Sequence, residues 1–257
     1  MGESRFPARM IRARISPLKA GLVVVDESTA HYLGRVLRLK TGDRFIAFCD
    51  VARSEAIAEL VRADEKSGAL ELTLAVANVA PAKVLARIPI TVVQGLAKGD
   101  KCDQIVRDAT ELGATRIVFA DTERTIVRLK GERAEERQKR WQRIAEEAAR
   151  QCGRADPPHV GGPLSWEAAI RQMDGARFCL WENAKAPLRD PLLEALRVRE
   201  PISFAVGPEG GLSEAETLLA ENGGCRVVSL GPFVLRTETV ATAVLGAIRI
   251  FASEPEG

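Results

Sequence analysis

Residues 90–113, ITVVQGLAKGDKCDQIVRDATELG, place a short apolar run directly before a helical pattern. The run ITVVQGL has the length and the β-branched residues of a buried strand. Between Lys101 and Leu112 the apolar residues recur at helical spacing, and Gly113 is suited to ending a helix. A buried strand that leads into a helix is the repeating unit of an α/β protein.

The same alternation continues to the end of the chain. Further strands are predicted at RIVFA (116–120), RFCLW (177–181), ISFAV (202–206) and CRVVSL (225–230). The intervening helices are predicted at 132–152, 165–173, 190–196, from Ser213 onward, and at 237–251. Strands that alternate with helices indicate a mostly parallel sheet covered on both faces.

The last predicted helix has an apolar face at helical spacing, which is expected to be buried. Its members are Val240, Ala243, Val244, Ala247, Ile248 and Phe251. Thr237 is a suitable N-cap, and Glu238 is a first-turn acid that suits the positive end of the helix dipole. Arg236 is unexplained by capping, and burying it unpaired would be costly, so we expect an anionic partner for it.

The chain before residue 81 has a different pattern. From Gly21 to Ala77, short apolar runs separated by turn signals are typical of a small β-barrel or sandwich. One helix is predicted from Ser28 to Leu39, with His31, Arg35 and Arg38 on one face. We therefore predict one domain over residues 1–80, a proline-bracketed linker over 81–89, and a second domain over 90–257.

Charge is distributed unevenly along the 257 residues, whose formal net charge is only +2. Residues 1–44 hold nine Lys and Arg against four Asp and Glu, which is typical of a protein with a phosphate-rich partner, although a solvated basic face is an equal alternative.

No apolar run is long enough to span a membrane, and no secretory signal precedes the first domain, so we expect a cytoplasmic protein. Five dispersed cysteines and two histidines predict no metal site and no disulfide framework.

Ligands of open α/β sheets bind outside the carboxyl ends of the strands, which directs attention to three loops. They follow RFCLW, ISFAV and CRVVSL. The second loop, GPEGGLSEAE (207–216), contains three glycines and a capping box formed by Ser213 and Glu216, but capping does not explain Glu209. Neither a dinucleotide fingerprint nor a P-loop is present, and no nucleophile elbow occurs, so a triphosphate site and a serine hydrolase are disfavoured.

Five ordered blocks carry a resemblance to a known family. They are HYLGRVLRLKTGD (31–43), QGLAKGDKCDQIVRDATELG (94–113), EEAARQCGRADPP (146–158), GPEGGLSEAE (207–216) and LGPFVLRTETVATAVL (230–245). Together they resemble the RsmE family of 16S ribosomal RNA uracil-N3 methyltransferases, within the knotted SPOUT superfamily. The likeness extends over nearly the whole chain.

The resemblance implies a PUA-like RNA-binding β-barrel followed by a SPOUT α/β domain with a mostly parallel sheet and a C-terminal trefoil knot. It further implies a homodimer that binds S-adenosyl-L-methionine and methylates 16S rRNA in the 30S subunit. Carried over by position, the cofactor-binding residues are Leu180, Trp181, Val206, Gly207, Pro208, Glu209, Gly210, Gly211, Leu230, Gly231, Leu235, Arg236, Thr237 and Thr239.

Methylation at N3 requires loss of a proton and stabilisation of the uracil anion. We assign the second task to Arg236 and Arg154, with Arg236 alternatively holding the loops through Glu209 or Glu238. Glu209 is the candidate general base, with scaffolding as its alternative role. Phosphate contacts are assigned to Arg12, Arg14, His31, Arg35, Arg38, Lys40, Lys98 and Lys101.

Two other functions remain open at this stage. One is a SPOUT methyltransferase that modifies another rRNA or tRNA position. The other is a noncatalytic RNA-binding ribosome assembly factor. The intact GPEGG and LRTET segments favour an active cofactor site over a pure binding protein.

Overall fold

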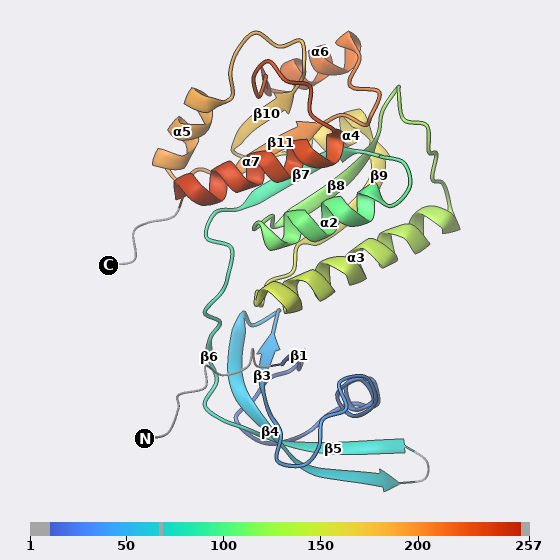
Figure 1. Ribbon diagram of the computed structural model, residues 1–257, viewed down its shortest axis with the longest axis vertical. Helices are drawn as coiled ribbons and strands as arrows, with labels where there is room; N and C mark the ends of the chain where they lie inside the picture. Colours follow the sequence, from blue (N-terminus) through green and yellow to red (C-terminus); the bar gives the residue numbers. More distant parts are fainter. Residues whose placement is uncertain (1–10, 67–68, 253–257) are drawn as a thin grey trace. The chain divides into compact units, whose positions relative to one another are not determined.

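The computed structural model describes residues 11–66 and 69–252 (Figure 1). The chain forms two compact units. The first contains the described residues up to Leu85 together with Arg150–Asp156, and the second contains Ala86–Ala149 and the chain from Pro157 onward. The segment 150–156 thus belongs to the first unit although it lies within the predicted second domain. The boundaries drawn from sequence at 80 and 90 remain a prediction.

The first unit is built on a six-stranded mixed sheet in the order β1-β3-β4-β5-β2, with β6 paired to β4. The strands are β1 (Arg12–Arg14), β2 (Gly21–Val24), β3 (Arg44–Cys49), β4 (Ser54–Lys66), β5 (Ala69–Val76) and β6 (Ala80–Pro81). β1 runs parallel to β3, and the other pairings are antiparallel. Phe45, Leu60 and Leu74 lie at its buried apolar centre.

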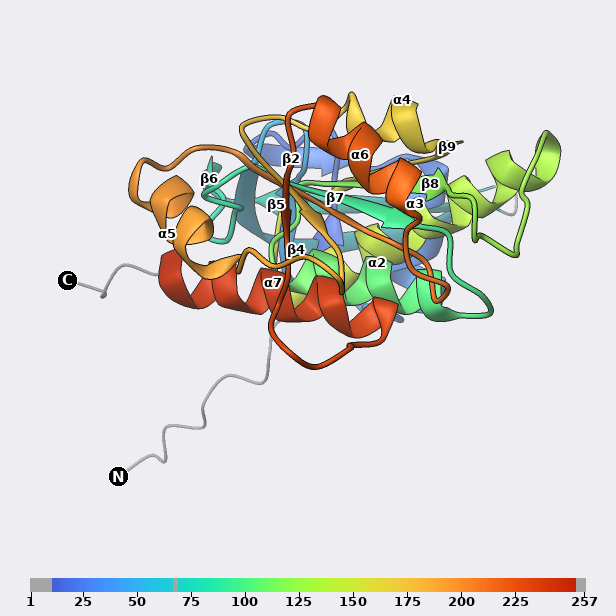
Figure 2. The ribbon, with the colours of Figure 1, turned by 90° about the horizontal axis from the view of Figure 1, so that it is seen from above.

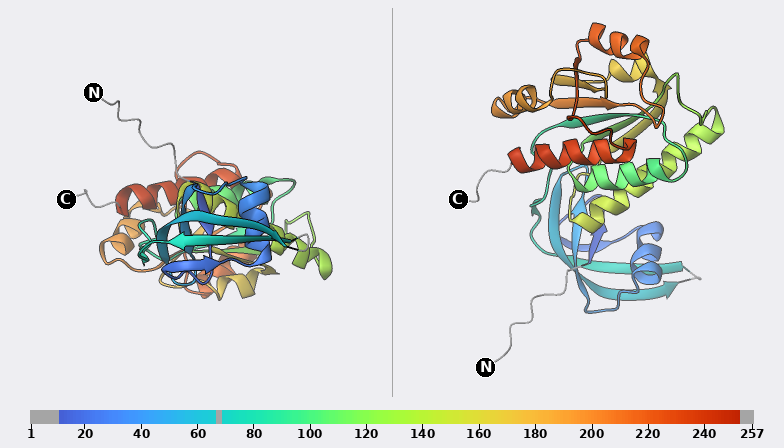
Figure 3. Two further views of the ribbon diagram at one scale, coloured as in Figure 1. Left: turned by 90° about the horizontal axis from the view of Figure 1, so that it is seen from below. Right: turned by 45° about the horizontal axis from the view of Figure 1, so that its top comes forward.

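The helix predicted over 28–39 is wrong in its extent. Helix α1 (Glu27–His31) passes into a π-helical turn, η1 (Tyr32–Val36), and α1 lies against β5 (Figure 3). Arg38 lies beyond the helix with φ 55°, so it does not continue the face of His31 and Arg35. The wider π turn changes the angular spacing of side chains, which a 3.6-residue period cannot anticipate.

The second unit has a six-stranded parallel sheet in the order β12-β10-β11-β7-β8-β9. Its strands are β7 (Ile90–Gly95), β8 (Arg116–Asp121), β9 (His159–Ser165), β10 (Ala176–Leu180), β11 (Ile202–Val206) and β12 (Arg226–Val228). The helices are α2 (Lys101–Glu111), α3 (Glu132–Cys152), α4 (Trp166–Ile170), α5 (Arg189–Arg197), α6 (Glu214–Asn222) and α7 (Thr237–Ala252). The predicted α/β class with a mostly parallel sheet is confirmed for this part of the chain.

Helices cover both faces of the parallel sheet (Figure 2). Val92 and Phe204 share one apolar cluster with residues of α2, α3, α5 and α7. Val93 and Ala205, which point to the opposite face, pack with residues of α4 and α6. Successive strand residues point to opposite faces, so burial on both sides explains the nearly continuous apolar runs of these strands.

Two features of the second unit differ from expectation. Strand β9 was not predicted because Gly161, Gly162 and Pro163 interrupt its apolar pattern, and it forms an edge, where proline is tolerated.

Helix α7 buries a stripe that only partly coincides with the predicted face. Its buried members are Thr237, Ala241, Val244, Leu245 and Ile248, whereas Ala243 and Phe251 are exposed. α7 is apolar on most sides, so periodicity did not determine which stripe faces the sheet.

The five cysteines are free thiols, and only Cys152 is not fully buried. Burial raises the pKa of the Cys102 and Cys225 thiols to about 11. Burial also raises the pKa of Cys179. These three thiols are therefore protonated at neutral pH and act as small packing residues. Within residues 11–66 and 69–252, no helix combines the length and the apolar character needed to cross a membrane.

Candidate functional site

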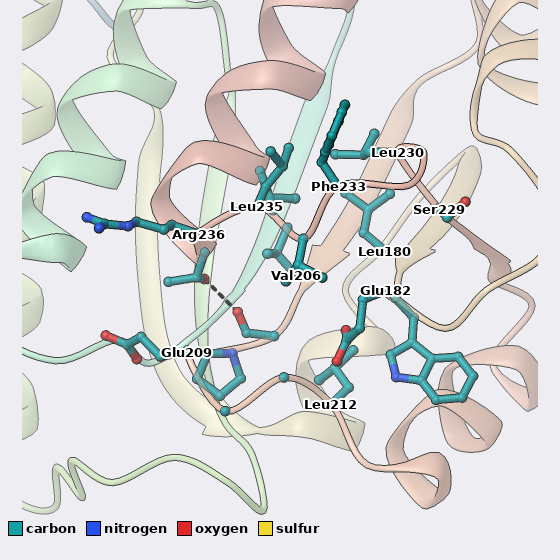
Figure 4. Close-up of a pocket in the computed structure, with 18 of the residues that line it drawn as sticks. Leu180, Glu182, Val206, Glu209, Leu212, Ser229, Leu230, Phe233, Leu235 and Arg236 are labelled. Carbon is teal, nitrogen blue, oxygen red and sulfur yellow. Dashed lines mark hydrogen bonds between the residues drawn. The ribbon is translucent and has the colours of Figure 1, made fainter.

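A pocket of about 390 Å³ lies where the loops after three neighbouring strands of the parallel sheet meet (Figure 4). Leu180 ends β10 and is followed by Trp181 and Glu182, Val206 ends β11 and is followed by Gly207 to Leu212, and Ser229 to Leu235 follow β12. The carboxyl ends of parallel strands lie at one edge of a sheet, so these loops converge there. The start of α7 and Lys101 from the start of α2 complete the lining.

The lining is apolar in one part and charged in another. Leu180, Val206, Leu230 and Leu235 gather near Phe233 (Figure 4). The carboxylates of Glu182 and Glu209 also line the pocket, at separate places (Figure 4). Apolar walls with a few polar groups are typical of small-molecule sites.

A buried hydrogen-bond network holds the loop after β11 against the start of α7. The Gln94 Nε2 donates to Thr237 Oγ1 at 2.7 Å, and Thr237 Oγ1 donates to the Gly207 carbonyl at 2.6 Å. Gln94 Nε2 also lies 3.2 Å from the same carbonyl. The prediction that Thr237 is the N-cap is wrong, because its hydroxyl serves this network. The Arg236 carbonyl instead accepts from Thr239 and Val240, which places Arg236 at the cap position.

Two glycines allow the close packing of the loops. A Cβ on Gly95 would lie 2.6 Å from Pro208, so glycine at the end of β7 admits the loop after β11. Gly211 has φ 73°, and a Cβ there would lie 2.7 Å from Glu182 Oε1. Glycine is therefore favoured at Gly211 by its backbone conformation, whereas the flexible Glu182 side chain could move away from a Cβ.

Lys101 lies between two carboxylates at the edge of the pocket. Its Nζ is 3.1 Å from Glu209 Oε1 and 3.4 Å from Glu238 Oε2. The hydrogen bond with Glu209 is the main cause of a raised Lys101 pKa. Burial alone would raise the pKa of Glu209, but hydrogen bonds from its own N–H and that of Lys98, together with the Lys101 ammonium, hold it below its ordinary 4.5. Glu209 is thus an ionised carboxylate and a weak base.

The expectation of a buried, ion-paired Arg236 is wrong. Its side chain is exposed, and among the described residues no carboxylate pairs with it, because Glu209 and Glu238 pair with Lys101 instead. The guanidinium extends away from Leu180 and Glu182 (Figure 4). An exposed arginine pays little desolvation penalty, so it requires no internal partner.

Arg154, the other candidate for anion stabilisation, belongs to the first unit and does not line the pocket. It is buried, with Nε 3.0 Å from Asp156 Oδ1 and Nη2 2.8 Å from the Asp156 carbonyl. Its catalytic assignment stays a prediction.

The predicted cofactor residues converge, with one exception. All of them line the pocket apart from Thr239. The lining also includes residues that were not predicted for this role, namely Lys101, Glu182, Leu212, Ser229, Phe233, Val234 and Val240. The loop positions alone would have included most of these, because they flank the same strand ends.

The residues predicted to contact RNA differ in whether they are already paired with a carboxylate of the protein. Arg12 and Arg14 are paired at 2.9 Å with Glu55 and Asp50. The remaining candidates in the first unit are exposed; they are His31, Arg35, Arg38 and Lys40. In the second unit Lys98 is exposed, whereas Lys101 is bound to the two pocket carboxylates.

Comparisons with known proteins agree with this architecture. Residues 85–249, more than half of the chain, match the RNA methyltransferase domain family. Residues 25–72 match the RNA methyltransferase PUA domain family. The two matches fall on the parallel α/β sheet and on the mixed sheet, respectively.

Curated relatives named ribosomal RNA small subunit methyltransferase E include those of Synechocystis and Bacillus subtilis. The first is 34% identical over 88% of this chain and 72% of the relative, and the second is 31% identical over 85% and 86%.

Two solved structures of similar fold were determined with S-adenosylmethionine. The small subunit methyltransferase E of Neisseria gonorrhoeae is 28% identical, with TM-score 0.78 over 94% of this chain and 97% of that one. A Legionella pneumophila protein in complex with the same cofactor is 26% identical, with TM-score 0.82 over 95% and 98%. Taken with the two domain matches and the curated relatives, these likenesses make this chain a PUA-containing member of the RsmE family of RNA methyltransferases, in the SPOUT superfamily.

Proposed function

We propose that this protein transfers a methyl group from S-adenosyl-L-methionine to N3 of a specific uridine in 16S rRNA of the small ribosomal subunit. The observation that carries the proposal is the pocket at the ends of β10, β11 and β12, in a chain of this family. The relatives solved with S-adenosylmethionine support the choice of cofactor. The curated names of relatives support the small-subunit rRNA as substrate.

The residues present fit such a cofactor. Leu180, Val206 and Leu230 offer apolar surface for an adenine ring. The indole Nε1 of Trp181 is buried without a hydrogen-bond partner in the described structure, which leaves a donor beside the pocket. Glu182 provides a negative charge suited to a cationic ligand.

When bound, S-adenosylmethionine would supply an electrophilic methyl group; its transfer would form a nitrogen–carbon bond at N3, break the sulfur–carbon bond and release the N3 proton to water. The protein must then position the base and stabilise its negative charge. Arg236 provides a guanidinium free of any carboxylate among the described residues, at the edge of the pocket. The low pKa of Glu209 favours its alternative role, in which it holds Lys98 and Lys101 in place rather than accepting the uracil proton.

We further propose that the working unit is a homodimer and that the C-terminal segment threads a trefoil knot. Apolar side chains of the β12–α7 loop and of α7 support the dimer, since Phe233 and Val234 are each 82% exposed, Ile250 is 70% exposed and Phe251 is 60% exposed.

The proposal of a knot is supported by two hydrogen bonds that hold the C-terminal segment between loops. Ser229 N donates to the Ala186 carbonyl, and Leu188 N donates to the Ser229 carbonyl. Stretching the denatured chain from both ends tests the knot, since a knotted chain extends less than its contour length.

The first experiment is methyl transfer from labelled S-adenosylmethionine to 30S subunits that lack their usual modifications, followed by nucleoside mass spectrometry and position mapping. N3-methyluridine at a single decoding-region position is the expected product. Another methylated nucleoside would favour a SPOUT enzyme with a different RNA target. Failure to bind S-adenosylmethionine in calorimetry would contradict the proposal and favour the assembly factor.

Arg236→Ala gives a sharper test of the site. The side chain is exposed, so the variant should retain the melting temperature while methyl transfer falls about 100-fold, in the range of a lost electrostatic stabiliser. Arg189→Ala, which removes an exposed arginine from α5, is the matched control. Full activity of the Arg236 variant would overturn its assignment.

A further inference from the structure

The segment between β8 and α3 has a regular alternation of exposure although it is neither helix nor strand. Arg124, Ile126, Arg128 and Lys130 are exposed, whereas Thr125 is buried and the residues at 127 and 129 are half-buried. Alternation with period two is the pattern of an extended chain. The segment runs along an outer edge of the second unit in two views (Figures 1 and 2).

The exposed side of this segment is cationic. Arg124, Arg128 and Lys130 are exposed, and neither Arg128 nor Lys130 forms an ion pair within 4.0 Å with any residue that the structure describes, while the charges of both partly offset the effect of burial on the pKa of Asp121. Alternate residues of an extended chain lie about 6.6 Å apart. That separation is close to the spacing of successive phosphates along an extended nucleic-acid strand.

The first residues of the segment are fixed to the pocket. Arg124 Nη1 donates to the Gly210 carbonyl at 2.9 Å, and Gly210 lines the pocket. Glu123 N donates to Glu216 Oε1 at 2.8 Å, while Glu216 Oε2 accepts from Ser213 N in the capping box of α6. The row of cations therefore begins at the glycine loop of the pocket and leads away from it.

The inner side of the segment contributes to a second cavity, whose charged lining residues are three arginines and one glutamate, Glu136. Val127 and Leu129 line a space of about 310 Å³ together with Arg133, Arg137 and Arg140 of α3. Arg137 is held by the Gly99 carbonyl at 3.2 Å, and Arg140 is held by Asp103. Arg133 is exposed and adds a further cation next to the row.

We infer that residues 124–130 form a phosphate track for the RNA strand that enters the pocket, with Arg128 and Lys130 as contacts to the sugar-phosphate backbone. The inference rests on the proposed function, because it takes RNA as the substrate of the neighbouring site. It adds a contact surface in the second unit to the basic candidates of the first. Such contacts set affinity and register without reading bases, so the track should act on any sequence.

The test compares two double variants with the same change in charge. Arg128→Glu with Lys130→Glu alters the track, and Arg189→Glu with Arg197→Glu alters two exposed arginines of α5 in the same unit. Affinity for unmodified 30S subunits and for a labelled single-stranded fragment around the target uridine is measured over a series of salt concentrations. Calorimetry with S-adenosylmethionine and thermal melting are run on every variant.

We expect the track variant to bind RNA at least about tenfold more weakly, with a salt slope smaller by about 0.7 for each lost single-strand contact. The α5 variant should retain affinity and slope, and both should bind the cofactor normally. The neutral pair Arg128→Gln with Lys130→Gln should give a smaller loss in the same direction. If the track variant and the α5 variant have the same RNA affinity and the same salt slope, while the unaltered protein methylates RNA, the phosphate track is wrong but the proposed function stands. Failure of the unaltered protein to methylate any RNA would instead overturn the proposed function.

Discussion

Lys101 at the edge of the pocket lies between two carboxylates, those of Glu209 and Glu238. Lys101→Met removes the cation and leaves two carboxylates of like charge near each other. Two causes that lower the Glu209 pKa, the hydrogen bond from the Lys101 ammonium and its charge, would then be lost, so that pKa should rise, although the N–H groups of Glu209 and Lys98 would still oppose the effect of burial. The acid limb of the pH profile of methyl transfer should move to higher pH. Lys101→Arg is the control, and an unchanged acid limb in the Met variant would contradict this account.

Asp26 gives a second prediction at the residue scale, in the first unit. Its carboxylate caps α1 by accepting from the Thr29 N–H at 2.9 Å and from the hydroxyls of Ser28 and Thr29. The hydrogen bond from Ser28 is the largest cause that lowers its pKa from 3.8 to about 2. Asp26→Ala should reduce the free energy of unfolding by about 1 kcal/mol at neutral pH.

The pH dependence of that effect has a definite sign. A folded-state pKa below the unfolded value stabilises the fold fully above pH 3.8, and the contribution is lost as the pH falls towards about 2. Urea unfolding of the native protein and of Asp26→Ala should therefore converge in acid. Asp26→Ser keeps a capping oxygen without the charge and should lose the pH dependence but retain part of the stability.

At the scale of elements, the Thr237 hydroxyl joins α7 both to β7 and to the loop after β11. Thr237→Val keeps the side-chain shape but leaves the Gly207 carbonyl and the Gln94 amide without their shared partner. Loss of this buried hydrogen bonding should reduce the free energy of unfolding by about 1 to 3 kcal/mol and weaken cofactor binding. Thr242→Val, further along α7, removes a bond within the helix only and serves as the control. Similar losses in both variants, measured by denaturant titration, would argue against a special role for Thr237.

Elements with a clear local signal were predictable. Helix α3 has the predicted bounds, α2 differs by one residue, and the capping box of Ser213 and Glu216 has both of its hydrogen bonds. The elements that were wrong or missed depend on information that is not local. Leu33 of the π turn packs in the apolar centre of the first unit, and the strand that contains Gly162 pairs with β8, so both elements have neighbours distant in the sequence.

The candidate site likewise has features that the sequence predicted and features that it did not. The three loops followed from the order of strands and helices, because ligands of parallel sheets lie at the carboxyl ends of strands. The ion-pair partners of the charged residues did not follow from that order. Lys101 is the first residue of α2, after β7. It pairs with Glu209 of the loop after β11 and with Glu238 of α7. Only the folded arrangement shows that these pairings leave Arg236 to solvent.

At the scale of the whole molecule, the exposed apolar side chains predict self-association. Phe233→Asp with Val234→Asp should raise the dimer dissociation constant at least about tenfold, as expected when apolar anchors of an interface are lost. Leu218→Asp changes a residue that is 56% exposed on α6 and should leave the dimer intact. Sedimentation velocity over a dilution series measures the effect. A monomeric native protein at every concentration would contradict the dimer.

The hydrogen bonds that join Arg124 to Gly210 and Glu123 to Glu216 have a thermodynamic consequence. We expect a ligand that shifts the glycine loop to shift the start of residues 124–130 as well, so the two sites should be linked by a coupling free energy. Linkage is reciprocal: the factor by which S-adenosylmethionine changes RNA affinity must equal the factor by which RNA changes S-adenosylmethionine affinity. Two titrations, each with and without the other ligand, measure both factors. Arg124→Ala should bring both factors towards one, so that each ligand binds as though the other were absent.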